Sequence, residues 1–181
     1  MIRAILLTMG LTAGLPALAQ DNNQLEVPQV EAPMSLPRLM DILLAVDPEL
    51  RTNGTAFEMT VADLPVTVIT DPIADRMRAL IPIRSADGMS REELERVMQA
   101  NFDTTLDARY AVAQGRLWAV YIHPLAALER DQLLSALGQL VNSAHTYGTD
   151  YSGGLFTFGG GDSARMQRER IEDLLRRGED I

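Results

Sequence analysis

The 181-residue sequence contains no cysteine and no lysine, and all sixteen of its basic residues are arginine. Without cysteine, the chain can form no disulfide, thiolate nucleophile or zinc–thiolate site. Without lysine, it can form no Schiff base, P-loop or Ser–Lys dyad. Burial of a hydrophobic core must therefore hold the fold, and several large classes of enzyme are excluded.

Positive charge is also scarce, since the formal net charge is −9. A phosphate backbone repels a net anion unless basic residues cluster tightly, and an anionic lipid surface repels it in the same way. Nucleic acid is therefore not expected as a partner, and adhesion to a membrane surface is not expected either.

The N-terminal apolar run is too short to span a bilayer, which needs about 20 residues. It follows Arg3, extends over residues 4–13 and precedes Ala17-Leu18-Ala19, a small-x-small site. This pattern is typical of a secretory signal peptide, here residues 1–19, cleaved after Ala19. The protein is therefore expected to be periplasmic or secreted, with no membrane insertion after cleavage and no lipid-anchored cysteine.

Residues 20–35 are polar and carry Pro28 and Pro33 without an apolar period, which predicts a flexible linker. Ser35 then has the position of an N-cap for a helix that starts at Leu36 and stops at Asp47-Pro48. Three strand-like segments follow (57–61, 66–70 and 77–83): the first and third alternate apolar and polar residues, and the second is β-branched throughout, which together indicate an antiparallel meander. Pro82 indicates a sheet edge or a bulge, because proline cannot donate to a ladder.

The second half of the domain begins with Ser90 and Glu93, the residues of a capping box, which open a helix to about Asn101. A turn at Gln114-Gly115 joins two further strands, 109–113 and 117–122. A long leucine-rich helix is expected from about Ala126 to Thr146. The domain is thus expected over residues 36–148, followed by a Gly-rich connection (149–162) and a C-terminal amphipathic helix (163–181).

The element order is helix, three strands, helix, two strands, helix, plus the C-terminal helix. This order resembles the type III secretion chaperone fold (the Tir-chaperone type) and its relatives of the YbjN type. The similarity is local as well. A helix ends at residues 97–102, which include Asn101 and Phe102, just before a hairpin. That hairpin, residues 110–122, then leads into the Leu-rich stretch 133–144. The resemblance implies an α+β domain with an antiparallel five-stranded sheet. It further implies a homodimer joined through the second helix and neighbouring strands, hydrophobic patches that hold a client segment, and no catalysis.

Three groups of residues are candidates for binding. Trp118, Val120 and Ile122 share one face of a strand whose other face is also apolar, so a helix, a second subunit or a partner is expected to cover them. Leu94 and Met98 lie on one side of the second helix. The arginines Arg76, Arg78 and Arg84 are candidates for an anion-binding or acidic-partner face, or for ordinary ion pairs on a wet sheet face.

A catalytic or metal-binding interpretation depends on two histidines, His123 and His145, which lie far apart in the sequence. His145 with Ser152 is the only candidate for a small hydrolase, yet no nucleophile-elbow motif surrounds Ser152. No metal or cofactor is expected. The sequence therefore predicts an exported, non-catalytic protein- or peptide-binding domain, with a structural envelope protein without ligand as the alternative.

Overall fold

The computed structural model describes residues 31–103, 105–148, 169 and 171–176, all of which belong to one unit, Glu31–Ile181. The predicted signal peptide (1–19), the Gly-rich connection (149–162), and most of the linker (20–35) lie outside these residues. The C-terminal helix is described only at 169 and 171–176, where the chain is helical.

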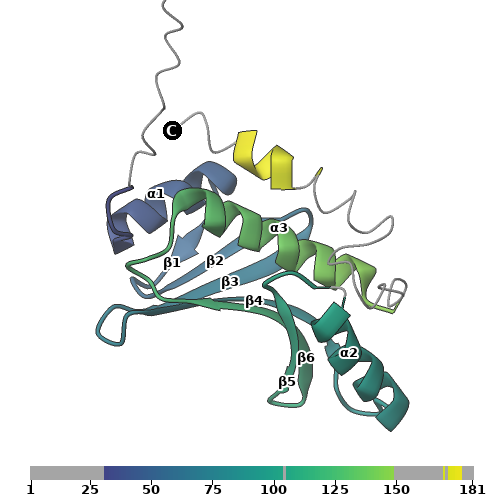
Figure 1. Ribbon diagram of the computed structural model, residues 1–181. Helices are drawn as coiled ribbons and strands as arrows, with labels where there is room; N and C mark the ends of the chain where they lie inside the picture. The colour runs from purple at the N-terminus through teal and green to yellow at the C-terminus, as the bar shows by residue number, and fades with distance from the viewer. Residues whose placement is uncertain (1–30, 104, 149–168, 170, 177–181) are drawn as a thin grey trace, which may run out of the picture. The chain divides into compact units, whose positions relative to one another are not determined.

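Six antiparallel strands form one sheet in the order β1-β2-β3-β4-β6-β5 (Figure 1). Their bounds are β1 (Arg51–Thr52), β2 (Ala56–Val61), β3 (Leu64–Asp71), β4 (Arg76–Ser85), β5 (Arg109–Ala113) and β6 (Arg116–His123). The α+β class and the antiparallel sheet are confirmed. The expected number of five strands is corrected to six, because the Asn53-Gly54 turn folds the chain back and pairs β1 with β2.

Pro82 lies in β4, which is an interior strand between β3 and β6. The register shifts between Pro82 and Arg84, so Pro82 is opposite Trp118 while Arg84 is opposite Leu117. The bulge accommodates a proline that has no N–H to donate. Of the two predicted alternatives, the bulge is confirmed and the sheet edge is wrong.

Within residues 31–148 as described, three helices accompany the sheet: α1 (Leu36–Val46), α2 (Arg91–Asp103) and α3 (Arg130–Thr146). The Ser35 hydroxyl accepts from the N–H of Arg38, and Ser90 and Glu93 exchange the two hydrogen bonds of the predicted capping box, at 2.9 and 3.1 Å. The long helix begins at Arg130 and not near Ala126. The preceding residues are held in a turn, since the Ala126 N–H donates to the Asp75 carboxylate at 2.7 Å.

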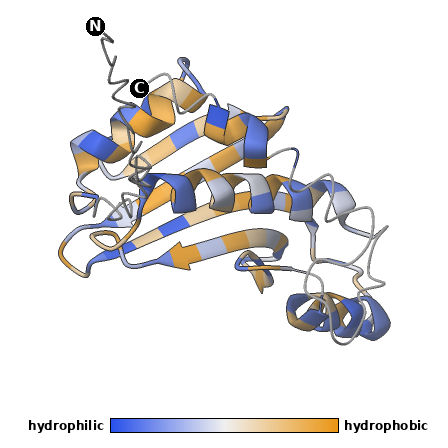
Figure 2. Ribbon diagram, turned by 45° about the horizontal axis from the view of Figure 1, so that its top comes forward, coloured by the Kyte–Doolittle hydropathy of each residue, from blue (hydrophilic) through white to orange (hydrophobic). Residues whose placement is uncertain are grey.

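The core lies between one face of the sheet and helices α1 and α3. Buried side chains from every second strand position, such as Phe57, Val68, Ala79 and Ala119, form one cluster with leucines of both helices. Figure 2 shows the resulting alternation of hydrophobic and hydrophilic residues along the strands. A smaller cluster joins α2 to the sheet at its β5 side.

The last residues of the predicted linker belong to this packed unit. Met34 is buried, and its N–H donates to the carbonyl of Ala126. The Glu31 carboxylate accepts from the N–H of Arg130 and pairs with Arg38, and these contacts hold the pKa of Glu31 below its ordinary value. Within the described residues, no helix is long and apolar enough to cross a membrane.

Candidate protein-binding surfaces and the pocket between α3 and β6

Trp118, Val120 and Ile122 point to the sheet face opposite the core. Their cross-strand neighbours on β4 are Pro82, Leu80 and Arg78, so this face continues across the sheet. We call it the outer face, defined by Ile69, Arg78, Leu80, Pro82, Trp118, Val120 and Ile122. None of the described helices packs on it, yet its centre is apolar, and Ile69 and Ile122 are 43% and 55% exposed. A solvated antiparallel face is normally polar.

One row of the outer face combines apolar surface with charge. Arg78 is directly opposite Ile69 on β3 and directly opposite Ile122 on β6. A shallow pocket of about 430 Å³ is lined by these three residues together with Arg76 and Met77, among others. Asp71 also lines this pocket. Among the described residues, however, no carboxylate forms an ion pair with Arg78, whose cross-strand neighbours on both sides are exposed isoleucines.

Arg84 does not share this face, although the sequence pattern predicted that it would. The bulge after Pro82 turns it toward the helix side, where its guanidinium lies 3.4 Å from the carboxylate of Glu93 on α2. The structure therefore brings Arg76 and Arg78 to one strand face and places Arg84 elsewhere.

Trp118 is held in place by its own hairpin. Its indole N–H donates to the carbonyl of Ala113 at 3.0 Å, and the Arg116 guanidinium lies over its ring, 5.7 Å from the centroid. The side chain is only half-buried by these contacts. An aromatic ring that is fixed but still accessible loses little conformational freedom on binding, which is a property of interface anchors.

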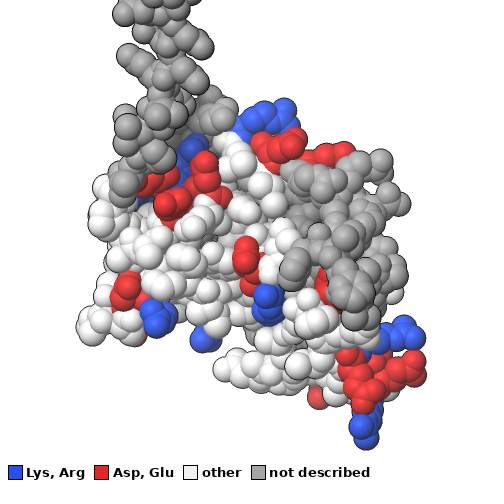
Figure 3. All heavy atoms as spheres, viewed as in Figure 1, with Lys and Arg blue, Asp and Glu red and all other residues white. Residues whose placement is uncertain are grey.

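Helix α2 carries a second exposed apolar group, which we call the α2 stripe: Leu94, Met98 and Phe102. These residues are spaced four apart and are 38%, 67% and 68% exposed. Phe102 was not among the predicted binding residues, although its spacing from Met98 was visible in the sequence. Two ion pairs flank the stripe, Arg91–Glu95 and Arg96–Glu92. Figure 3 shows the resulting mixture of basic and acidic side chains around α2.

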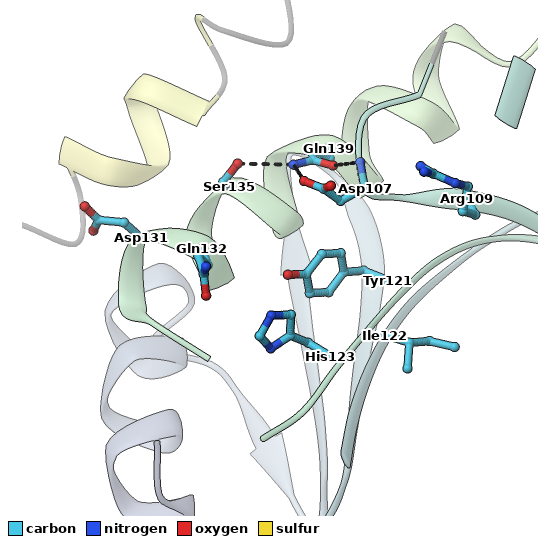
Figure 4. Close-up of a pocket in the computed structure, with 9 residues that line it drawn as sticks. All are labelled: Asp107, Arg109, Tyr121, Ile122, His123, Asp131, Gln132, Ser135 and Gln139. Atoms are coloured by element: carbon cyan, nitrogen blue, oxygen red, sulfur yellow. Dashed lines mark hydrogen bonds between the residues drawn. The ribbon is translucent and has the colours of Figure 1, made fainter. Parts of the chain in front are cut away.

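A third site is a pocket of about 560 Å³ between α3 and the end of β6. It forms beside the start of β5, because β5 begins only opposite Val120 and the last residues of β6 are therefore paired with β4 but not with β5. Figure 4 shows the rings of Tyr121 and His123 directed toward α3, with Ile122 on the opposite side of the strand. The two rings are stacked, with centroids 5.9 Å apart.

The polar side chains of this pocket mainly form hydrogen bonds with the loop before β5. The Gln139 amide oxygen accepts from the N–H groups of Asp107 and Ala108, at 2.8 and 3.0 Å. Its amide nitrogen donates to the Asp107 carboxylate and the Ser135 hydroxyl (Figure 4). Gln139 is buried, so these hydrogen bonds satisfy a polar side chain that water does not reach. It was missed in the sequence because its partners lie about thirty positions away along the chain.

The ring of His123 has a fixed hydrogen-bonding role. Its Nδ1 lies 2.8 Å from the carbonyl oxygen of Pro124. Because a carbonyl can only accept, Nδ1 carries the hydrogen, and in the neutral ring Nε2 is left as an acceptor. His145 is exposed in the last turn of α3. Ser152 lies outside the described residues, so the His145–Ser152 pair is not placed, and no group of metal-ligating residues occurs among the described ones.

Tyr121 gives this pocket a measurable titration. Burial, and in second place the Asp107 carboxylate, raise the pKa of the Tyr121 hydroxyl above its ordinary value of 10.0. We expect Asp107→Asn to lower the pKa of Tyr121 toward 10.0, as measured by tyrosinate absorbance, with Tyr121→Phe identifying the signal. Above pH 10 the unfolded chain loses this proton first, so the free energy of unfolding should fall as pH rises. Tyr121→Phe should remove that part of the decline, and an Asp107→Asn protein with unchanged titration would contradict the assignment.

Comparisons with known proteins give structural matches alone, since no family model and no curated protein matches the sequence. The type III secretion chaperone SycH of Yersinia pestis, in complex with a stable fragment of YscM2, is 20% identical over 63% of this chain and 98% of its own, with a TM-score of 0.49. The structure of the HopA1–SchA chaperone–effector complex is 12% identical over 64% of this chain and 98% of its own, with a TM-score of 0.46. The ExoT–SpcS complex from Pseudomonas aeruginosa is 18% identical over 60% of this chain and 91% of its own, with a TM-score of 0.44.

The resemblance to type III secretion chaperones that the sequence indicated is thus found again among solved structures. At these identities and TM-scores, the likeness transfers no partner or client to this chain.

Proposed function

We propose that this protein is an exported, non-catalytic domain that forms a homodimer and holds an extended segment of another protein on the outer face of its sheet. The observation that carries the proposal is the apolar centre of that face, which none of the described helices covers. Contiguous apolar surface of this kind is typical of a protein interaction site.

The chemistry of the outer face selects the kind of segment. Isoleucines flank Arg78 on both sides, and Trp118, Val120 and Leu80 extend the apolar surface along the strands. An extended chain places every second side chain on one face. A segment that presents aliphatic side chains and one carboxylate on the same face would cover the isoleucines and compensate the guanidinium.

The α2 stripe is the proposed dimer contact. Two copies of a protein with a net charge of −9 repel each other over most of their surfaces. Around the stripe, however, two arginines are paired with two glutamates, so this surface is locally neutral. A two-fold contact must be self-complementary, and a neutral apolar stripe flanked by both signs of charge meets that condition.

Export is proposed from the sequence pattern of residues 1–19, which predicts cleavage after Ala19. It sets the form of the protein to be tested, which begins at Gln20, and the compartment in which a client would be found.

Binding to the outer face can be measured with a defined probe. A dye-labelled extended peptide of alternating isoleucine and glutamate should bind saturably by fluorescence anisotropy, whereas the same peptide with arginine for glutamate should not. Trp118→Asp should weaken binding by about tenfold or more, because a carboxylate would then occupy the apolar contact. Arg78→Glu should reverse the preference between the two peptides.

Ile73→Asp is the matched control, since Ile73 is fully exposed in the turn between β3 and β4 and lies outside the strands. It should bind the acidic peptide as the unchanged protein does. Equal binding of both peptides, or equal affinity of the Trp118→Asp and Ile73→Asp proteins, would refute the proposed client surface. A folded protein that binds neither peptide would favour a structural role without ligand.

A further inference from the structure

The strongest unexplained feature of the core is a glycine in the middle of α3. Gly138 is buried in an otherwise leucine-rich helix, where glycine is unfavourable. A Cβ atom at this position would lie 2.7 Å from Cγ1 of Ile171 and 3.4 Å from its Cα. Real Cβ atoms essentially never approach a neighbour as closely as 2.7 Å. The absent side chain therefore makes room for the C-terminal helix, which is described at 169 and 171–176 (Figure 1, yellow).

The C-terminal helix meets the domain through one apolar face. Ile171, Leu174 and Leu175 are spaced i, i+3 and i+4 and so lie on the same side of the helix. Leu174 is 2% exposed and belongs to the core cluster that also contains leucines of α1 and α3, while Leu175 packs against that cluster. The receiving surface therefore belongs to the helix layer, and we call it the groove over Gly138, because only the absence of a side chain at Gly138 leaves room for Ile171.

The occupant of this groove is weakly attached. Among its described residues, the apolar contact consists of Leu174, which is buried, and Ile171 and Leu175, which are half-buried. Short helices are marginal in isolation, so the helicity of residues 171–176 is expected to depend on docking. A contact of this size opens locally far more easily than the whole domain unfolds.

We propose that the groove over Gly138 is a second binding site, for amphipathic helices with large aliphatic residues at i, i+3 and i+4, and that the chain's own C-terminal helix occupies it as a detachable latch. A client that supplies such a helix would displace the latch; this last step rests on the proposed function, whereas the latch itself does not. The site differs from the outer face, because it lies on the helix layer on the other side of the sheet.

The test uses the full chain and its lack of cysteine. Leu174→Cys introduces the only thiol, so its labelling rate reports how often the latch opens. In this background we expect Gly138→Ala to raise the labelling rate by about tenfold, since the new Cβ excludes Ile171. Adding Ile171→Ala removes Cγ1 and should restore much of the protection. Glu172→Cys, on the exposed side, should label fast with or without Gly138→Ala.

A second arm tests the exchange of the occupant. A synthetic peptide of residues 163–181, added in excess to the Leu174→Cys protein, should accelerate labelling by occupying the groove. Labelling of Leu174→Cys as fast as Glu172→Cys in the unchanged background would show that no latch is docked, and unchanged labelling with the peptide would show that the groove does not exchange its occupant. Either result would overturn the proposal without bearing on the outer face, which the peptide anisotropy assay tests separately.

Discussion

Met98→Asp is expected to convert the proposed dimer into a monomer, at concentrations where the unchanged protein is expected to be dimeric. Met98 is the middle residue of the α2 stripe, between Leu94 and Phe102. In a dimer joined through this stripe, the new carboxylate would be buried against apolar side chains without a partner, which costs several kcal/mol. Because each 1.4 kcal/mol is a factor of ten, the dissociation constant of the dimer should rise by about 100-fold or more.

The measurement is light scattering or sedimentation equilibrium over a dilution series. Met98 is 67% exposed in the isolated chain, so the substitution should leave the free energy of unfolding of the monomer nearly unchanged. Met40→Asp is the matched control, because it makes the same change on an exposed position of another helix, α1. If Met98→Asp and Met40→Asp dimerise with the same constant, α2 is not the dimer contact. An unchanged protein that stays monomeric at every concentration would remove the dimer from the proposal.

Features with local chemistry were predictable from the sequence. Ser35, the Ser90–Glu93 box and the Gln114-Gly115 turn each act through residues within three or four positions, and each is found where the pattern placed it. Period-two alternation identified the buried face of the main strands because a half-covered antiparallel sheet imposes that period. Pro82 indicated a sheet edge or a bulge, and the interior position of β4 in the sheet decides for the bulge.

Features that depend on register were not predictable. A bulge adds one residue, and a shift of one residue transfers every later side chain to the other face of the sheet. Alternation therefore grouped Arg84 with Arg76 and Arg78, whereas the structure pairs Arg84 with Glu93 on α2. Strand β1 was missed for a different reason: two residues are too short to show any period, and only pairing with Phe57 and Glu58 defines it.

Residues that act across long sequence separations were missed as well. Asn101 holds both the N–H and the carbonyl of Tyr110, at 2.7 and 3.0 Å, and so acts as a substitute neighbour for the edge strand β5. The sequence singled out Asn101 as part of a resemblance, without a physical role. Gln139 gave a weaker signal, since it is an amide side chain in a leucine-rich helix that also contains Gln132 and Asn142. Its partners could be identified only in three dimensions.

Gln139→Leu is expected to lower the free energy of unfolding by about 3 kcal/mol, since two N–H groups in the loop before β5 lose their acceptor and each unsatisfied group costs about 1–3 kcal/mol. Leucine is close to glutamine in size, so lost packing contributes little. The Asp107 carboxylate also loses its donor, and the start of β5 should loosen. Native-state hydrogen exchange should therefore show faster exchange at the amides of Asp107 and Ala108 than at Tyr110, which Asn101 still holds.

Gln99→Leu is the matched control, because it makes the same substitution at an exposed position of α2 and removes only one long hydrogen bond, from the Gln99 amide to the Asp103 carboxylate at 3.4 Å. It should lower the free energy of unfolding by about 1 kcal/mol or less. Chemical denaturation measures both proteins. If Gln139→Leu were as stable as Gln99→Leu, the two loop N–H groups would have found another acceptor. The loop before β5 would then be held mainly through its carbonyl groups, since the Arg109 guanidinium donates to the carbonyl of Ala108 at 2.8 Å but cannot accept from an N–H.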